Sequence, residues 1–437
     1  QQLLDMAETS LRKMAAGGIY DQVAGGFHRY ATDDLWLVPH FEKMLYDNAL
    51  LAVAYLEAYQ VTGKSEYSET VAEILDYVVR DMMSPKSLFY SATDADSITP
   101  DGRSLEGYYF TWTESELIEA LGVEDFELVR SHYNVTSGGN FEGRNILHRR
   151  ASFEATAEKF EISAEELKDK ISQINKKLYD FRNKRDLPFR DEKHLTSWNS
   201  LMISAFAKAG FALKKESYLE IAEKAAKAVL EHLSQKCRLL RTNKSSESQI
   251  EGFLDDYAYF IAALLDLYEA TYKSHWLLKA IKLDNIIAEE FEDKENGGYF
   301  MNSASGEKLI AREKPCYDSA IPSGNAVTVM NLMRMAVLTG DDGYRQRYQK
   351  AISYFLGSPD IHPVGQAEML KALDFMLDKP KEIILLIPED KQQEGEHYLD
   401  AIRKRFVPNK VLVVLESEGQ SSPLVEVVPI IRSKKAI

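Results

Sequence analysis

One unit recurs along the chain: an apolar helix, a short polar turn, and an amphipathic helix that opens near an aromatic residue. Four copies are plain, in the sequences EAYQVTGKSEYSETVAEIL, AKAGFALKKESYLEIAEKA, YEATYKSHWLLKAIKLDNI and MAVLTGDDGYRQRYQKAISYF. Two helices joined by a few polar residues form an antiparallel αα-hairpin. The chain is therefore predicted to consist of repeated helical hairpins.

The two helices of each hairpin differ in how their apolar residues are distributed. Segments 40–60 and 253–272 are apolar on nearly all sides, which predicts burial on most faces. Segments 66–84 and 217–234 carry one apolar stripe and a charged face, so they are expected outside. Inner helices are predicted near residues 40–60, 113–133, 196–213, 253–272, 322–339 and 365–378, and outer helices near 1–17, 66–84, 163–183, 217–234, 276–293 and 344–356.

Six alternating pairs, with short inner-to-outer links and long outer-to-inner links, favour a closed all-α (α/α)6 barrel over an open solenoid. After residue 378 the pattern changes, because KEIILLIPED and KVLVVLESEG have the character of strands on either side of the helix HYLDAIRKRF. We expect a barrel domain over residues 1–378 and a small α/β lobe over 379–437. The lobe lacks a glycine-rich phosphate loop, which favours a packing role. The barrel wall is expected to bury Phe41, Leu45, Leu201, Leu264 and Val329.

Charge and cysteine content narrow the partners and the compartment. The 53 Lys and Arg against 68 Asp and Glu leave a formal charge of -15, which opposes binding to nucleic acid or to an acidic membrane surface. Cys237 and Cys316 match no zinc or redox spacing, so we expect them reduced and unpaired, and we expect neither metal nor cofactor. With no membrane-length apolar stretch and no recognisable leader, a cytoplasmic location is predicted.

The densest group of glycine and polar residues is GGIYDQVAGGFHRYATDDLWLVPHFEKMLYDN, residues 17–48. Histidine is the usual proton-transfer group near neutral pH, and paired carboxylates serve the same purpose. The catalytic candidates of this segment are His28, His40, Glu42 and Asp47, and the substrate-binding candidates are Tyr20, Arg29 and Tyr46. In a helix over 40–60, Glu42 and Tyr46 would share a face. Lys43 and Asp47 would form an i,i+4 ion pair.

Further candidates begin other inner helices or lie in other long links, and a closed barrel brings such links to one rim. The catalytic candidates are Asp94, Asp96, Asp255 and Asp256, and the substrate-binding candidates are Glu106, Trp112, Trp198, Asn199, Tyr257, Ser323 and Asn325. A structural role competes for each, because acids and asparagines also cap helices. Asp94 and Asp96 alternate like calcium ligands, but the glycine and distal glutamate of a calcium loop do not follow.

Several motifs resemble the spermatogenesis-associated, thioredoxin-domain-containing family of animals and bacteria. They are GGIYDQVAGGFHRY, WLVPHFEKMLYDNALL, FYSATDADS, EGYYFTW, LTSWNSLMI and DDYAYFIAALLDLYEA, and they run from about residue 10 to about residue 340. The resemblance implies a six-hairpin glycosidase-like barrel related in shape to sugar 2-epimerases and glucuronyl hydrolases. It also implies an N-terminal thioredoxin-like domain, which these residues lack and which is the expected partner in the full-length protein.

The predicted function is carbohydrate-active, with a sugar-like ligand in the barrel mouth. Hydrolysis needs two acids about 5 Å apart for retention or roughly 6.5–9.5 Å apart for inversion. Epimerisation instead needs two proton-transfer groups, here histidines, on opposite sides of one carbon. The alternative is a non-catalytic module that binds a glycan or a protein segment and serves an attached thioredoxin-like domain. Unusual ionisation of buried acids or histidines would favour an enzyme.

Overall fold

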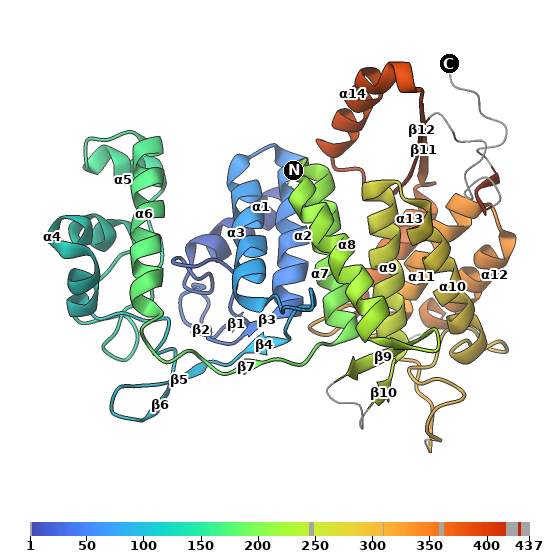
Figure 1. The fold of residues 1–437 in the computed structure, drawn as a ribbon, viewed down its shortest axis with the longest axis horizontal. Coiled ribbons are helices and arrows are strands. Elements are labelled where there is room, and N and C mark those ends of the chain that lie inside the picture. Colours follow the sequence, from blue (N-terminus) through green and yellow to red (C-terminus); the bar gives the residue numbers. More distant parts are fainter. Residues whose placement is uncertain (1, 244–248, 309, 358–361, 417–426, 430–437) are drawn as a thin grey trace. The chain divides into compact units, whose positions relative to one another are not determined.

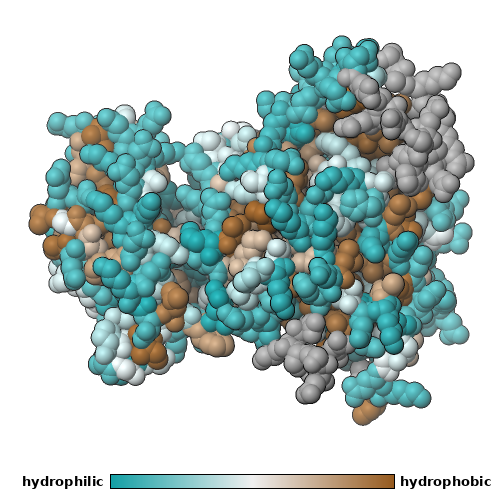
Figure 2. All heavy atoms as spheres, in the orientation of Figure 1, coloured by the Kyte–Doolittle hydropathy of each residue, from teal (hydrophilic) through white to brown (hydrophobic). Residues whose placement is uncertain are grey.

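The computed structural model describes residues 2–243, 249–308, 310–357, 362–416 and 427–429, most of them helical (Figure 1). The chain divides into two compact units. Unit 1 comprises residues 1–58, 64–83 and 90–192, and unit 2 comprises residues 59–63, 84–89 and 193–437. Hydrophilic side chains cover most of the face shown in Figure 2, and hydrophobic ones appear there in small groups.

Unit 1 holds the first helices and a series of two- and three-residue strands. Its helices are α1 (Gln2–Ala16), α2 (Leu45–Thr62), α3 (Ser65–Tyr77) with a π-helical turn at Val78–Met82, α4 (Glu114–His132), α5 (Phe153–Lys159) and α6 (Ala164–Arg182). Its strands are β1 (Tyr30–Ala31), β2 (Pro39–His40), β3 (Lys43–Met44), β4 (Ala92–Thr93), β5 (Asp96–Ile98), β6 (Ser104–Glu106) and β7 (Arg190–Asp191). They pair antiparallel as β1–β2, β3–β4–β7 and β5–β6.

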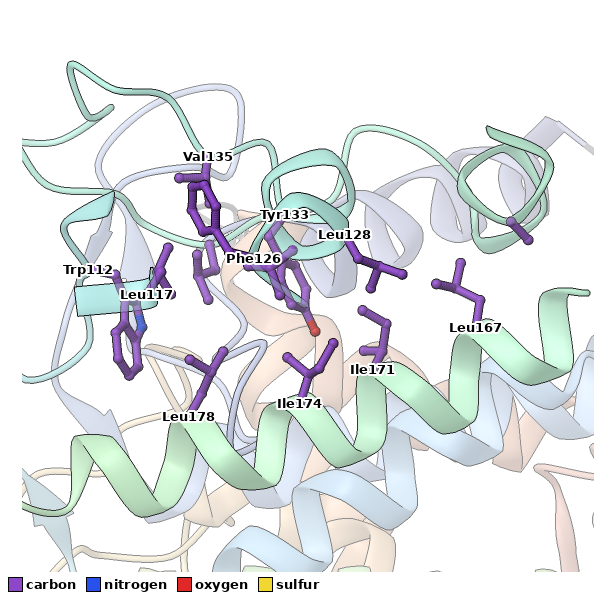
Figure 3. Packing of buried hydrophobic residues seen from close by; sticks show 13 residues of the cluster. Trp112, Leu117, Phe126, Leu128, Tyr133, Val135, Leu167, Ile171, Ile174 and Leu178 are labelled. Carbon is purple, nitrogen blue, oxygen red and sulfur yellow. The ribbon is translucent and has the colours of Figure 1, made fainter. Parts of the chain in front are cut away.

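A core cluster in unit 1 forms between α4 and α6 (Figure 3). Capping boxes at Thr113 and Ser163 satisfy the first backbone N–H groups of these helices. Helix α6 then presents one apolar face at helical spacing, and this face packs on α4 and its flanking residues. The side chains on the α6 face are Leu167, Ile171, Ile174 and Leu178, and their partners include Trp112, Leu117, Phe126, Leu128 and Tyr133.

The inner helix expected over 40–60 begins at Leu45, so that part of the prediction is wrong. Residues 39–40 instead pair with β1 as the short strand β2, and residues 43–44 pair with β4 as β3. The extended backbone satisfies their polar groups, for example where the Arg29 N–H donates to the Glu42 carbonyl oxygen at 2.8 Å. Lys43 does not pair with Asp47. Its Nζ lies 2.8 Å from an oxygen of Asp21.

Unit 2 repeats the predicted hairpin three times. Its helices are α7 (Thr196–Ala212), α8 (Glu216–His232), α9 (Leu254–Thr271), α10 (Ser274–Glu290), α11 (Gly324–Thr339), α12 (Asp342–Leu356) and α13 (Ala367–Leu377), the last preceded by a 3-10 turn at Pro363–Gln366. Helices α7, α9, α11 and α13 pack in a row, and α8, α10 and α12 each pack on the inner helix before them. The strands β8 (Ser234–Gln235), β9 (Arg238–Asn243) and β10 (Gln249–Glu251) form one small sheet between α8 and α9.

Of the five residues expected to be buried in the barrel wall, four are buried. Phe41, Leu45, Leu264 and Val329 are at most 1% exposed, whereas Leu201 is only half-buried. Cys237 is an exposed free cysteine and Cys316 a buried one. Within the described residues, no helix is long and apolar enough to cross a membrane.

The C-terminal segment has the predicted strand–helix–strand order. Strands β11 (Lys381–Ile387) and β12 (Lys410–Glu416) are parallel and are joined through a 3-10 turn (Glu389–Lys391) and α14 (Gln392–Arg403). This lobe is attached to the later turns of α9 and α11, where Glu269 contacts Lys410 at 3.0 Å and Arg334 at 2.8 Å. Residues 417–426 and 430–437 of the expected lobe lie outside the described residues, and the domain boundary after residue 378 stays a prediction.

One link in unit 1 is held by a buried ion cluster. Asp21 accepts hydrogen bonds from Lys43 Nζ at 2.8 Å and from both terminal nitrogens of Arg182 at 2.9 and 3.0 Å. Lys43 Nζ also donates to the Gly25 carbonyl oxygen at 2.8 Å. After the turn, the Phe27 N–H donates to Asn48 Oδ1 at 2.8 Å, and Asn48 Nδ2 donates back to the Phe27 carbonyl oxygen at 3.1 Å. The side chains of 17–48 thus hold the backbone of this link.

A link in unit 2 repeats that geometry with different residues. Lys314 Nζ donates to Asp293 at 2.8 Å and to the Gly297 carbonyl oxygen at 3.0 Å. The Tyr299 N–H donates to Asn325 Oδ1 at 2.8 Å, and Asn325 Nδ2 donates to the Tyr299 carbonyl oxygen at 2.9 Å. The same two-way clamp recurs between Asn199 and Phe89, at 2.7 and 3.0 Å. Three inner helices therefore hold an aromatic link residue through an asparagine near their first turn.

We expect Asn199→Ala and Asn325→Ala each to lower the free energy of unfolding by about 2–4 kcal/mol, because each leaves buried backbone N–H and C=O groups without partners. Urea titration of the full chain measures this loss, and Asn285→Ala on the exposed face of α10 is the matched control. Unchanged stability together with weaker ligand binding would contradict this expectation and support the substrate-binding role that the sequence predicted for these two residues.

Candidate functional site

Short strands and the first turn of α2 bring six polar residues of unit 1 together. Strand pairing places Tyr30 opposite His40 and Asp96 opposite Glu106, so the two hairpins carry His40 and Glu106 at fixed positions. Helix α2 adds Tyr46 and Asp47 from its first turn. The set, named here the His40 cluster, is Arg29, His40, Glu42, Tyr46, Asp47 and Glu106, all of them predicted from the sequence.

Both ring nitrogens of His40 lie against carboxylates. Its Nδ1 is 2.8 Å from Glu106 Oε1, and its Nε2 is 3.4 Å from Glu42 Oε2. The same Glu42 oxygen accepts a hydrogen bond from Arg29 Nη1 at 3.0 Å, and Arg29 also bonds the Tyr46 side chain. A half-exposed ring, Tyr30, lies with its centroid 5.2 Å from that of His40. The cluster thus joins charged hydrogen-bonding groups to an accessible aromatic face.

Asp47 is the acid of this cluster whose ionisation departs most from the ordinary range. Burial raises the pKa of its carboxyl to about 7, although the Arg29 charge opposes that rise. Its Oδ2 atom is buried and has no hydrogen-bond partner among the described residues. A carboxyl with a pKa near 7 is present in both protonation states at neutral pH, which suits it to donate and accept a proton.

In unit 2, two consecutive aspartates connect the starts of three inner helices. Asp256 is fully buried and accepts hydrogen bonds from the Ser197 N–H at 3.0 Å and the Phe253 N–H at 2.9 Å. The side chain of Asp255 lies against the start of α11 and accepts a hydrogen bond from the Gly324 N–H. Its Oδ1 is so close to Gly324 that a Cβ at this position would lie 2.2 Å from it. Burial and the neighbouring Asp256 raise the pKa of Asp255 to about 6. Burial also raises the pKa of Asp256.

Five residues predicted to meet a ligand make structural contacts, and their roles toward a ligand stay predictions. Trp112 is fully buried in the core cluster, and Asn199 and Asn325 are the backbone clamps described above. Tyr257 is buried, and its hydroxyl accepts from the Leu239 N–H at 3.0 Å. His28 is 2% exposed, its Nδ1 lies 2.9 Å from the Phe41 carbonyl oxygen, and burial with the nearby Lys43 charge lowers its pKa to about 3.

The remaining predicted residues lie at separate places. Asp94 and Asp96 are exposed, and Asp96 accepts from Ser104 Oγ at 3.1 Å. Ser323 caps α11 through the Ala326 N–H at 3.1 Å, and Trp198 is half-buried in the first turn of α7. The Tyr20 hydroxyl donates to Glu73 on α3. Their ligand-binding roles, and a single rim shared with the His40 cluster, stay predictions. Among the described residues, no group of three His, Cys, Asp or Glu side chains is arranged to hold a metal ion.

Over 95% of its length the chain is 36% identical to spermatogenesis-associated protein 20 of Homo sapiens. The chain is a homologue of that protein. It spans 57% of the human protein's length. The resemblance predicted from the sequence motifs is thereby confirmed, although no protein-family model matches the chain.

Solved structures with the fold of this chain include two glycoside hydrolases. One is an α-1,6-mannanase of glycoside hydrolase family 76 from Salegentibacter sp., solved as an inactive variant in complex with α-1,6-mannotriose. Its TM-score is 0.51 at 12% sequence identity, and the match covers 90% of this chain and 85% of that one. The other is a family 76 mannosidase from Bacteroides thetaiotaomicron, with a TM-score of 0.50, 10% identity, and coverage of 91% and 86%. They confirm the predicted α/α-barrel fold class.

Proposed function

We propose that this chain hydrolyses a glycosidic bond at the His40 cluster. The observation that carries the proposal is the Asp47 carboxyl, whose pKa burial raises to about 7 beside the Arg29–Glu42 pair. Glycoside hydrolysis requires two carboxyl groups in unlike environments, one that donates a proton and one that acts as a carboxylate. Asp47 and Glu42 are such a pair, because Asp47 is poorly solvated and Glu42 accepts a charge-assisted hydrogen bond.

In the proposed reaction, the Asp47 carboxyl donates its proton to the glycosidic oxygen as the bond to the anomeric carbon breaks. Glu42 supplies the second carboxylate, and water provides the hydroxyl that ends on the anomeric carbon and the proton that returns to the enzyme. Arg29 holds Glu42, and His40 bridges Glu42 and Glu106. The alternative of epimerisation by two histidines is less well supported, since His28 is 2% exposed and burial lowers its pKa to about 3.

A sugar is the proposed ligand class because the cluster alternates donors and acceptors around an accessible aromatic ring. Hydroxyl groups pair with both kinds of group, and the C–H face of a sugar ring packs on an aromatic face. The fold shared with an α-1,6-mannanase and a family 76 mannosidase makes α-mannosides the first substrates to test. This step is an analogy, since one fold carries many activities.

The test is turnover of α-1,6-mannobiose and a panel of p-nitrophenyl glycosides by the full chain, with products followed by proton NMR in D2O. We expect Glu42→Gln to lower kcat by about 10²–10⁴-fold. The matched control is Glu57→Gln, which removes an acid that lies about 15 Å along α2 from Asp47. Deuterium at C2 of a free sugar would instead show epimerisation. No turnover of any sugar, or equal loss in the control, would overturn the proposal.

A further inference from the structure

A cavity of about 1310 Å³ lies in unit 1 between α3, drawn blue in Figure 1, and α6, drawn green. Its lining residues come mainly from these two helices, the end of α1, the turn at 20–25 and segment 149–154, and Tyr55, Lys64, Arg80 and Tyr133 complete the lining. Small-molecule sites usually enclose about 300–1,000 Å³, so this cavity has room for a ligand longer than one sugar ring. Among the described residues that line it, none belongs to the His40 cluster.

Hydrogen bonds connect several of the residues that line this cavity. The Gln22 carbonyl oxygen accepts from Asn175 Nδ2 at 2.8 Å, and the Tyr133 hydroxyl donates to Asn175 Oδ1 at 3.0 Å. Lys168 on α6 and Glu69 on α3, which also line the cavity, form an ion pair at 2.9 Å. These bonds tie the two helices and the turn together, so a ligand would meet a wall that needs little reordering.

Glu73 stands out among the lining residues. Its side chain is accessible to solvent, yet enough protein surrounds it that burial raises the pKa of its carboxyl. Those two facts agree if solvent reaches Glu73 through the cavity. The Tyr20 hydroxyl donates to it, and Arg149 lies near enough to oppose the rise in its pKa. A poorly solvated carboxyl facing open space is typical of a ligand site.

The charges of the walls indicate the class of ligand. Lysine and arginine side chains line the cavity in nearly equal number with aspartate and glutamate, the acids being concentrated on α3. Such a balance gives no net attraction to a polyanion or a polycation. Tyr179 of α6 adds a partly exposed aromatic ring, whereas Tyr20, Tyr67 and Tyr133 are buried behind the lining and donate their hydroxyl protons to protein acceptors. Neutral hydroxyl-rich chains match this mixture of donors, acceptors and rings.

We propose that the α3–α6 cavity binds a neutral oligosaccharide at a second site, separate from the His40 cluster. The proposal rests on the proposed function only for the ligand class. The Glu73 carboxyl, held by the Tyr20 hydroxyl, accepts hydrogen bonds from sugar hydroxyls, and the cations of segment 149–154 and α6 donate hydrogen bonds to them. A site of this kind holds a longer glycan without taking part in bond cleavage.

The test replaces an exposed residue of the cavity lining with a larger side chain, which would occupy part of the cavity. Ser172 on α6 is exposed and lines the cavity, whereas the next residue, Gln173, is exposed and does not. Binding of neutral trisaccharides of glucose, mannose or N-acetylglucosamine to the full chain is measured by calorimetry. We expect at least one of them to bind, with a Kd raised tenfold or more by Ser172→Trp and unchanged by Gln173→Trp. Equal affinity in both variants, or no binding across the panel, overturns the proposal.

A second variant covers the case in which Ser172→Trp alters folding, which circular dichroism would reveal. Glu73→Gln keeps the side-chain volume and removes the ionisable group, and we expect it to raise the same Kd about three- to tenfold. The two proposals fail separately. Loss of turnover in Glu42→Gln with unchanged trisaccharide binding supports a distinct second site, whereas trisaccharide binding that depends on Glu42 and not on Ser172 or Glu73 contradicts it.

Discussion

Replacing Asp47 with asparagine is expected to raise the free energy of unfolding at pH 8 by about 2–4 kcal/mol while lowering turnover by two orders of magnitude or more. The folded-state pKa of about 7 lies above the value near 3.9 of an unfolded aspartate, so the fold favours the protonated carboxyl. Stability is therefore lost as the pH rises from about 4 to about 7, and ionised Asp47 carries the full penalty at pH 8. An uncharged amide removes that penalty.

The prediction is checked by urea titration of both proteins at pH 5 and pH 8. The stabilising effect of Asp47→Asn should be small at pH 5 and near its maximum at pH 8, and Glu57→Gln is titrated beside it as the control for removing an acid of α2. Turnover of the unsubstituted chain should fall as the pH rises through about 7, because the donor must be protonated. A variant that is less stable at both pH values would make Asp47 a structural acid and remove the basis of the proposed function.

The repeated hairpin could be predicted from the sequence because it depends on local periodicity. An inner helix such as α9 is buried on nearly every face, and its apolar residues surround the helix in the sequence as well. The start of α2 could not be predicted in the same way. Residues 39–44 have helical spacing, but pairing with β1 and β4 satisfies their backbone, and those partners are up to about fifty residues distant.

The candidate site could be predicted only in part, because the sequence shows the residue types and not the partners of their side chains. The six polar residues of the His40 cluster could be predicted because they lie in the polar links that precede inner helices or at the start of such a helix, but the partner of each side chain could not. Asn199 and Asn325 have the same chemistry as ligand-binding residues, and only the backbone of Phe89 and Tyr299 shows what they hold. Glu73 gave no signal, because on α3 it is one of several acids on a charged helix, and only the enclosing cavity distinguishes it.

The buried cluster around Asp21 gives the largest stability effect that we expect. Asp21 is 6% exposed and is the carboxylate partner of both Lys43 and Arg182. Burial opposes its ionisation, but the charges of Arg182 and Lys43 outweigh that effect and hold the pKa of Asp21 well below its usual range. Without Asp21, two buried cations would lose their counter-charge. We expect Asp21→Ala to lower the free energy of unfolding by about 3–5 kcal/mol.

Two variants separate charge from hydrogen bonding in this cluster. Asp21→Asn keeps the oxygen that accepts from the Val23 and Ala24 N–H groups at 3.1 and 3.2 Å, but removes the charge, so we expect a loss close to that of Asp21→Ala. In unit 2, Asp293 accepts a hydrogen bond from the cation Lys314. We expect Asp293→Ala to lower the free energy of unfolding by less than Asp21→Ala does. Denaturant titration in 0.1 and 1 M salt measures all three, and the Asp21 losses should change little with salt because the cluster is buried. A near-normal Asp21→Asn would show that the turn's hydrogen bonds, and not the buried charges, hold this link.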